Sequence, residues 1–271
     1  MVNWSHWHTE PLLVGGVLFI CWLYSLLIGP LRYRISRTSA FPSREAWYFG
    51  LGMVTFYLSV GSPLDALGEG FLFSAHMFQH NLLMYLSPLF IVLGIPGWLV
   101  DKAARKSRTF STVFGFLVHP VVAGIAFTFS FSLWHFPQLF EAALRSKPIH
   151  ALEHLTMFLS SIFMWWNISS RSKKFPPLQW GIQILFFFVL MVAQTPIFGI
   201  LTFSKEVLYP TYADAARIFP SLDPTSDQML GGLIMKLTNM IASLAVIGVA
   251  FYRWAKKSGP PEKIPPGGPL S

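Results

Sequence analysis

The chain has 271 residues, of which 53% are hydrophobic and only 12% are charged, whereas about 25% of the residues in a soluble globular domain are charged. Too few polar side chains are present to cover a soluble fold, so apolar segments in a lipid bilayer are expected instead. The net charge of +8 does not indicate nucleic-acid binding, because basic residues cluster between apolar runs. The single cysteine, Cys21, excludes a disulfide framework or a thiol-pair metal carrier.

Apolar runs long enough to cross about 30 Å of hydrocarbon follow one another along the chain. They lie at approximately 12–30, 46–63, 71–95, 112–135, 149–168, 178–203 and 228–254. No Lys or Arg precedes the first run, which is therefore predicted to be a retained helix and not a signal peptide. The predicted fold class is all-α, a seven-transmembrane helix bundle that forms one domain over residues 1–257. The segment 258–271, which contains Pro and Gly, is predicted to be a disordered cytoplasmic tail.

The connections between these runs differ in charge. Fifteen basic residues fall on one side, in the segments 31–45, 101–108, 169–177 and 253–263. Only four lie in the connections of the opposite side. Because Lys and Arg are enriched in cytoplasmic loops, the N-terminus is predicted outside and the C-terminus in the cytoplasm. The longest outer loop, 204–227, contains Tyr209, Tyr212 and Phe219, and we expect it to pack on the membrane surface.

Seven of the eight histidines fall near the predicted outer face. His76 and His80 lie in the outer half of the third predicted helix. His150 and His154 begin the fifth, and His135 ends the fourth. Each pair has i, i+4 spacing, so its two imidazoles project from one face of a helix. Two imidazoles one turn apart can bind a transition metal, and a second helix can complete the coordination.

Other polar residues near these pairs have different interpretations. His6, His8 and His119 are isolated, and isolated polar groups normally form local hydrogen bonds, so they are not predicted ligands. Glu153 adjoins the second histidine pair and can fix the tautomer of a ligating imidazole. Lys236 falls inside the seventh predicted span, where a charge is costly. We expect Lys236 either to extend to the interface or to pair with Glu153, and we favour the ion pair.

Several short blocks between residues 65 and 235 form a specific combination. They are His76-Met77-Phe78-Gln79-His80-Asn81-Leu82-Leu83, Trp134-His135-Phe136-Pro137, Glu141-Ala142-Ala143-Leu144, Glu153-His154, Trp165-Trp166 and Gly231-Gly232-Leu233-Ile234-Met235. Together they resemble the CtaG-type cytochrome c oxidase assembly factors of bacteria. The motif histidines of that family map onto His76, His80, His135, His150 and His154.

The resemblance implies a multi-pass protein of the bacterial plasma membrane that is needed to produce active haem-copper oxidase. It implies copper as the metal held or delivered at the outward-facing histidines. The expected partners are the lipid bilayer, an oxidase subunit and a copper donor protein. No Ser/His/Asp arrangement indicates an enzyme, and an assembly factor resembling a metallochaperone is expected instead.

Other functions fit parts of the pattern. In the main alternative, a haem-binding electron carrier, one histidine of the third helix and one of the fifth ligate haem from opposite sides. A retinal protein would use Lys236 as its Schiff-base lysine, but the third helix offers no acidic counter-ion. A proton-coupled transporter would need ionisable residues along its whole path, and the inner half offers little beyond His119.

Overall fold

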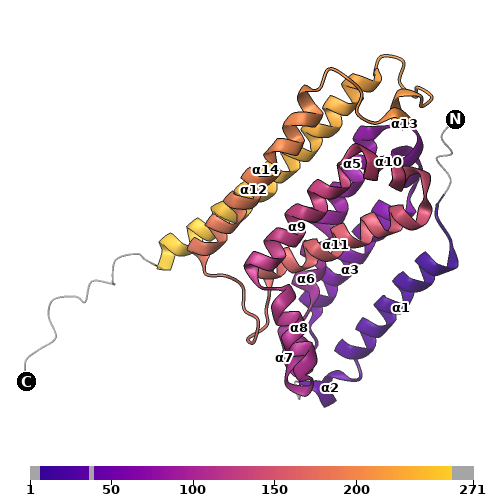
Figure 1. Cartoon of the computed structure of the whole chain (residues 1–271). Coiled ribbons are helices and arrows are strands. Elements are labelled where there is room, and N and C mark those ends of the chain that lie inside the picture. Colours follow the sequence, from indigo (N-terminus) through magenta and orange to yellow (C-terminus); the bar gives the residue numbers. More distant parts are fainter. Residues whose placement is uncertain (1–6, 37–39, 258–271) are drawn as a thin grey trace, which may run out of the picture.

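The computed structural model describes residues 7–36 and 40–257. His6 and the predicted disordered tail 258–271 lie outside the described residues. Within those ranges the chain is all-helical and contains no strand. Figure 1 shows a bundle in which the α12–α14 pair runs along one flank and α1 along the opposite flank. An all-α membrane protein, as predicted, is therefore supported.

The helices that are long and apolar enough to cross a membrane coincide with predicted runs. They are α1 (Pro11–Ile28), the continuous series α5 (Phe73–Asn81), η1 (Leu82–Leu86) and α6 (Ser87–Gly94), α12 (Trp180–Phe203) and α14 (Pro224–Lys257). The bent pair α8 (Arg108–Leu117) and α9 (Pro120–Trp134) forms a fifth if it is counted as one span. The described residues thus contain four or five spans by length and composition. Helices α3 (Ser43–Gly61) and α11 (Lys147–Ser169) lie at the remaining predicted runs but are less apolar.

The bend between α8 and α9 has a local cause. The two helices meet at 59°, and Pro120 begins α9. His119, which precedes this proline, has ψ 129°, the extended conformation that steric contact with a following proline ring favours. His119 is exposed at this bend.

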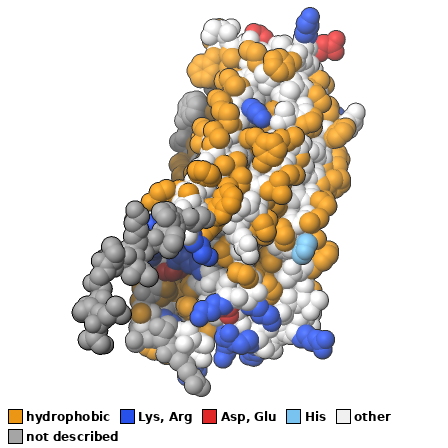
Figure 2. All heavy atoms as spheres, turned by 90° about the vertical axis from the view of Figure 1, so that its left-hand side faces the viewer, with side chains coloured by type: hydrophobic (Ala, Val, Ile, Leu, Met, Phe, Trp, Pro, Cys, Tyr) orange, Lys and Arg blue, Asp and Glu red, His pale blue; other side chains and the backbone are white. Residues whose placement is uncertain are grey.

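The remaining short helices lie near the two ends of the bundle. They are α2 (Arg32–Ile35), α4 (Pro63–Gly70), α7 (Gly97–Lys106), α10 (Pro137–Arg145) and α13 (Pro210–Ala213). Figure 1 shows α2 and α7 at one end, and α10 and α13 at the other end with the start of α5. In Figure 2, apolar side chains cover the face between the ends, and Lys and Arg gather toward the lower end. An exposed apolar band of this kind is expected of a surface in contact with lipid.

Helices α3 and α6 (Ser87–Gly94) approach each other closely because glycines face the contact. A Cβ atom added to Gly94 would lie 2.5 Å from the backbone nitrogen of Phe49, and one added to Gly52 would lie 2.9 Å from that of Ile91. Small residues at helix contacts allow such close backbone packing in membranes.

Gly94→Ala should therefore push α3 and α6 apart and lower the free energy of unfolding by about 1–3 kcal/mol, the usual cost of overpacking. The melting temperature of the detergent-purified variant measures this change. Gly50→Ala, on the same helix as Phe49 but with open space around the added methyl, is the matched control. Equal melting temperatures for the two variants would show that the contact between α3 and α6 accommodates the added methyl group without loss of stability.

Asp227, near the start of α14, holds the beginning of α5. Its Oδ2 accepts a hydrogen bond from the backbone N–H of Phe73 at 2.7 Å, and its Oδ1 accepts one from that of Ser74 at 3.1 Å. The carboxylate is fully buried. It satisfies N–H groups that have no partner within the first turn of a helix. The cap thereby sets the position of His76, which lies one turn further along α5.

Asp227→Ala should lower the free energy of unfolding by about 2 kcal/mol, because two buried N–H groups lose their acceptor. The melting temperature in detergent should fall accordingly. Asp214→Ala removes an exposed carboxylate near the same end of the bundle and should leave the melting temperature unchanged. A fall of the same size in both variants would point to net charge as the cause.

Candidate metal centre

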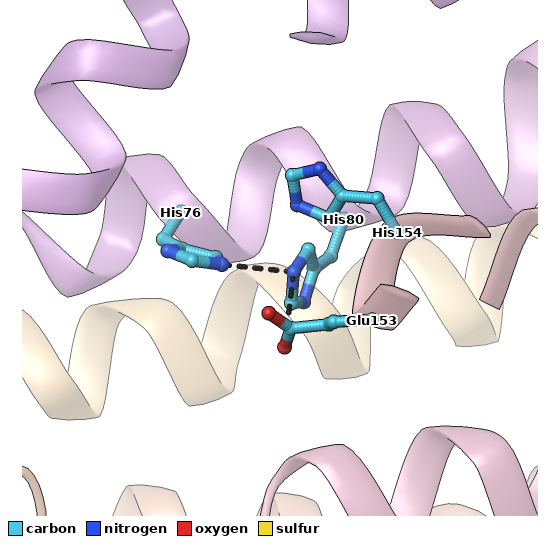
Figure 3. A group of neighbouring side chains, drawn as sticks. All are labelled: His76, His80, Glu153 and His154. Atoms are coloured by element: carbon cyan, nitrogen blue, oxygen red, sulfur yellow. Dashed lines mark hydrogen bonds and ion pairs between the residues drawn. The ribbon is translucent and has the colours of Figure 1, made fainter. Parts of the chain in front are cut away.

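Two helices bring four polar side chains together inside the bundle. His76 and His80 come from α5, and Glu153 and His154 come from α11. One potential ligand atom from each lies within 4.8 Å of the others, and all four residues are buried. Figure 3 shows the four side chains pointing toward one another across the space between the helices. The i, i+4 spacing on α5 places its two imidazoles on the same face.

The hydrogen bonds of Tyr212 determine which nitrogen of His76 carries the proton. The Tyr212 hydroxyl donates its single hydrogen to the carbonyl of Gly68 at 2.7 Å. It also lies 3.1 Å from Nδ1 of His76, where the hydroxyl oxygen can only accept. The hydrogen of neutral His76 is therefore on Nδ1, and its Nε2 carries the lone pair. This is the form in which an imidazole binds a metal through Nε2.

Two neighbouring histidines are held in the same tautomer. Nδ1 of His135 donates to the carbonyl of Phe131 at 2.6 Å, and Nδ1 of His150 donates to Oε1 of Glu69 at 2.7 Å. In the neutral imidazoles, Nε2 then carries the lone pair. Both Nε2 atoms are buried and have no hydrogen-bond partner in the described part of the chain.

The other polar atoms of the centre are poorly paired. Nε2 of His80 donates a hydrogen bond to Nε2 of His76 at 2.8 Å, whereas Nδ1 of His80 has no partner in the described part of the chain. Oε1 of Glu153 lies 3.6 Å from Nε2 of His80, which is too long for a hydrogen bond. Among the described residues, neither oxygen of Glu153 has a hydrogen-bond partner, nor has Nε2 of His154. Glu153 has no exposed surface. Buried polar atoms are almost always satisfied, so this group of unpaired acceptors fits a cation that would accept their lone pairs.

The donor set is typical of a transition-metal site. Three imidazoles and one carboxylate can surround an ion in a four-coordinate arrangement. Hydrogen bonds that orient ligating imidazoles through their second nitrogen are a regular feature of such sites. His135 and His150 border the four, since their rings lie 5.7 Å from that of His80 and 5.4 Å from that of His76 respectively. The five predicted histidines therefore form one cluster.

The predicted ion pair between Glu153 and Lys236 is wrong. Lys236 instead donates to the hydroxyl of Thr195 at 3.2 Å and lies over the ring of Phe198. Its side chain therefore stays on the α12–α14 pair, while Glu153 points from α11 toward His80. The two residues lie at a similar predicted depth, but Glu153 points into the bundle and Lys236 contacts α12, a difference that sequence position alone does not show.

The outer loop also differs from the prediction. Tyr209 and Tyr212 do not pack on the membrane surface, because both are buried over the histidine cluster, whereas Phe219 is exposed. Glu141 on α10 holds this loop by accepting hydrogen bonds from the N–H and hydroxyl of Thr211 at 3.0 and 2.8 Å. Tyr209 donates to the carbonyl of His135 at 2.8 Å. The loop 204–227 therefore closes one end of the cluster.

Sequence reasoning also missed two carboxylates on α4. Asp65 is buried and accepts a hydrogen bond from the amide of Gln79 at 2.5 Å. Burial and the nearby carboxylate of Glu69 raise the pKa of Asp65 to about 6. The signal available in the sequence was their i, i+4 spacing directly before the third predicted span, which places both on one helix face.

Comparison with known proteins gives one family and two relatives. The sequence model of the family described as cytochrome c oxidase caa3 assembly factor matches residues 22–257. An uncharacterized protein of Mycobacterium bovis and one of Mycobacterium tuberculosis are each 25% identical to the chain over 228 residues, a match that covers 78% of this chain and 34% of theirs. The chain thus spans about a third of the length of these curated relatives. No solved structure matches it.

Proposed function

Because the chain belongs to the cytochrome c oxidase caa3 assembly factor family, we propose that it holds copper for the oxidase in the centre formed by His76, His80, Glu153 and His154. The observation that carries this proposal is the convergence of four buried ligand atoms within 4.8 Å, several of them without a hydrogen-bond partner among the described residues. Copper is the cargo of this centre, and no chemical conversion is required of the protein.

The character of the ligands supports copper. Imidazole suits copper, zinc, iron and nickel, and copper(II) binds most tightly among the divalent ions of that series. Family membership favours copper further, since the oxidase that the family helps to assemble contains haem and copper. The carboxylate of Glu153 would offset the charge of the ion, and Tyr212 would keep Nε2 of His76 available to it.

The setting of the centre follows from the same proposal. The chain would be a multi-pass protein of the bacterial plasma membrane with seven spans, an outer N-terminus and a cytoplasmic C-terminus. The basic residues gathered toward one end of the molecule support this orientation (Figure 2). The centre would then face outward, toward a copper donor protein and an oxidase subunit that receives the metal.

Metal analysis of the detergent-purified protein, loaded with copper and then separated from unbound metal, tests the proposal. Wild-type protein should retain about one copper per chain, because a buried site of this kind releases its ion slowly. His80→Ala and His154→Ala should lose most of that copper. His119→Ala removes the exposed histidine at the α8–α9 bend and is the matched control. Wild-type protein without copper would overturn the proposal.

The same preparation separates copper from the haem alternative. Haem ligated by two histidines requires them on opposite faces of a flat porphyrin. Here the rings of His80 on α5 and His154 on α11 lie only 5.3 Å apart, and the ring of Phe140 packs 5.0 Å from that of His76. This crowding favours a single ion. A strong Soret band in the visible spectrum would favour haem instead.

A further inference from the structure

We propose that copper reaches the centre through an outer station formed by Asp65, His150 and His154, from which it passes inward. This inference rests on the proposed function. One ligand atom from each of these residues lies within 4.8 Å of the others, and all three residues are buried. His154 also belongs to the inner group of four. The two groups are therefore adjacent and share one ligand.

The outer station is built by residues of several segments. Asp65 is positioned by the amide of Gln79, which donates to its Oδ1 at 2.5 Å. Its Oδ2 lies 3.1 Å from Nε2 of His8, whose backbone N–H donates to the carbonyl of Gly61 at 2.9 Å. His150 is oriented by Glu69 so that its buried, unpaired Nε2 is free to bind. A carboxylate with an oriented imidazole is a regular part of metal sites.

Exposure decreases stepwise from the surface toward the centre. The side chains of Glu10, Glu69 and His8 are 52%, 32% and 16% exposed. Those of Asp65 and His150 are each 8% exposed, and that of Glu153 is fully buried. Every one of these residues can ligate or attract a cation. The series therefore marks a route on which an ion exchanges water for protein ligands in small steps.

Because His154 belongs to both groups, an ion can pass from the outer station to the inner group by ligand exchange. An ion held by the outer station can keep His154 while it exchanges Asp65 and His150 for His76 and His80. No step then leaves the ion without protein ligands in a buried space, where the loss of hydration is costly. The three carboxylates Glu10, Glu69 and Asp65 also concentrate cations at the outer end, which raises the rate of capture.

The time course of copper uptake by the purified, metal-free protein tests this route. A soluble copper complex is mixed with wild type, Asp65→Asn, Glu69→Gln and the control Asp214→Asn, which removes an exposed carboxylate outside the route. Asp65→Asn should slow uptake about tenfold, in the range expected for loss of electrostatic capture, and Glu69→Gln should also slow it. Both should finally hold as much copper as wild type, because the inner ligands remain. Asp214→Asn should match wild type throughout.

The outcomes separate this inference from the proposed function. Wild-type protein that takes up no copper would overturn the copper centre itself. Normal uptake rates in both Asp65→Asn and Glu69→Gln would overturn only the outer station. The melting temperature of each metal-free variant identifies any that fail to fold, and Glu69→Gln keeps the test decisive if Asp65→Asn is unstable, since Glu69 is a third exposed.

Discussion

Glu153→Leu is expected to make the metal-free protein more stable while lowering its copper affinity by about 100-fold or more, a loss at least as large as that from changing a residue that only orients a ligand. Glu153 is fully buried, and neither carboxylate oxygen has a hydrogen-bond partner within the described ranges. An apolar side chain of similar size removes this burial cost, and a gain of about 1–3 kcal/mol is expected. Melting in detergent and competition with a copper chelator measure the two effects.

Glu141→Leu supplies the contrast for this prediction. Glu141 is also a buried carboxylate near the same end of the bundle, but its oxygens accept hydrogen bonds from Thr211 and from Arg145. Its loss should therefore destabilise the protein. If Glu153→Leu lowered the melting temperature as much as Glu141→Leu does, Glu153 would be a satisfied structural residue, and its place in the centre would have to be abandoned.

Both Glu141 and Glu153 can be read from the sequence, but the difference in their hydrogen bonding cannot. The fold shows the same division between features that the sequence predicts and features that it does not. Helix positions follow from apolar runs, because a segment that crosses hydrocarbon must satisfy its backbone internally. The predicted run 178–203 coincides with α12 to within two residues. The π-helical turn η1 (Leu82–Leu86) was not predicted. In its middle the carbonyl of Met84 accepts a hydrogen bond from the indole of Trp165 at 3.1 Å, a contact between helices that the local sequence does not encode.

Some residues of the candidate centre could likewise be predicted from the sequence, and others could not. The pair His76 and His80 could be predicted because i, i+4 spacing is a property of one helix. The role of Glu153 could be proposed from its position beside His154, but its lack of partners depends on what surrounds it. Tyr212 and Asp65 were missed as parts of the site because they reach it only through the tertiary packing of a loop and a short helix. Lys236 was misassigned because depth in the membrane does not specify a helix face.

Tyr212→Phe should lower copper affinity by about 10- to 100-fold, the effect usual for residues that orient a metal ligand. The substitution removes the oxygen that accepts the Nδ1 hydrogen of His76. His76 can then place its hydrogen on Nε2, and binding through Nε2 would first require moving that proton. Chelator competition at fixed pH measures the affinity, and the stoichiometry at saturation should remain that of wild type.

Tyr209→Phe distinguishes the tautomer effect from a general loss of packing. Both hydroxyls are buried in the same loop, but that of Tyr209 donates to the backbone carbonyl of His135 and touches no imidazole nitrogen of the centre. Tyr209→Phe loses one buried hydrogen bond and should cost about 1 kcal/mol of stability, whereas Tyr212→Phe loses two and should cost about 2 kcal/mol. Only Tyr212→Phe should weaken copper binding. Equal losses of affinity would mean that the loop acts as a lid over the centre and that His76 does not depend on Tyr212 for its protonation state.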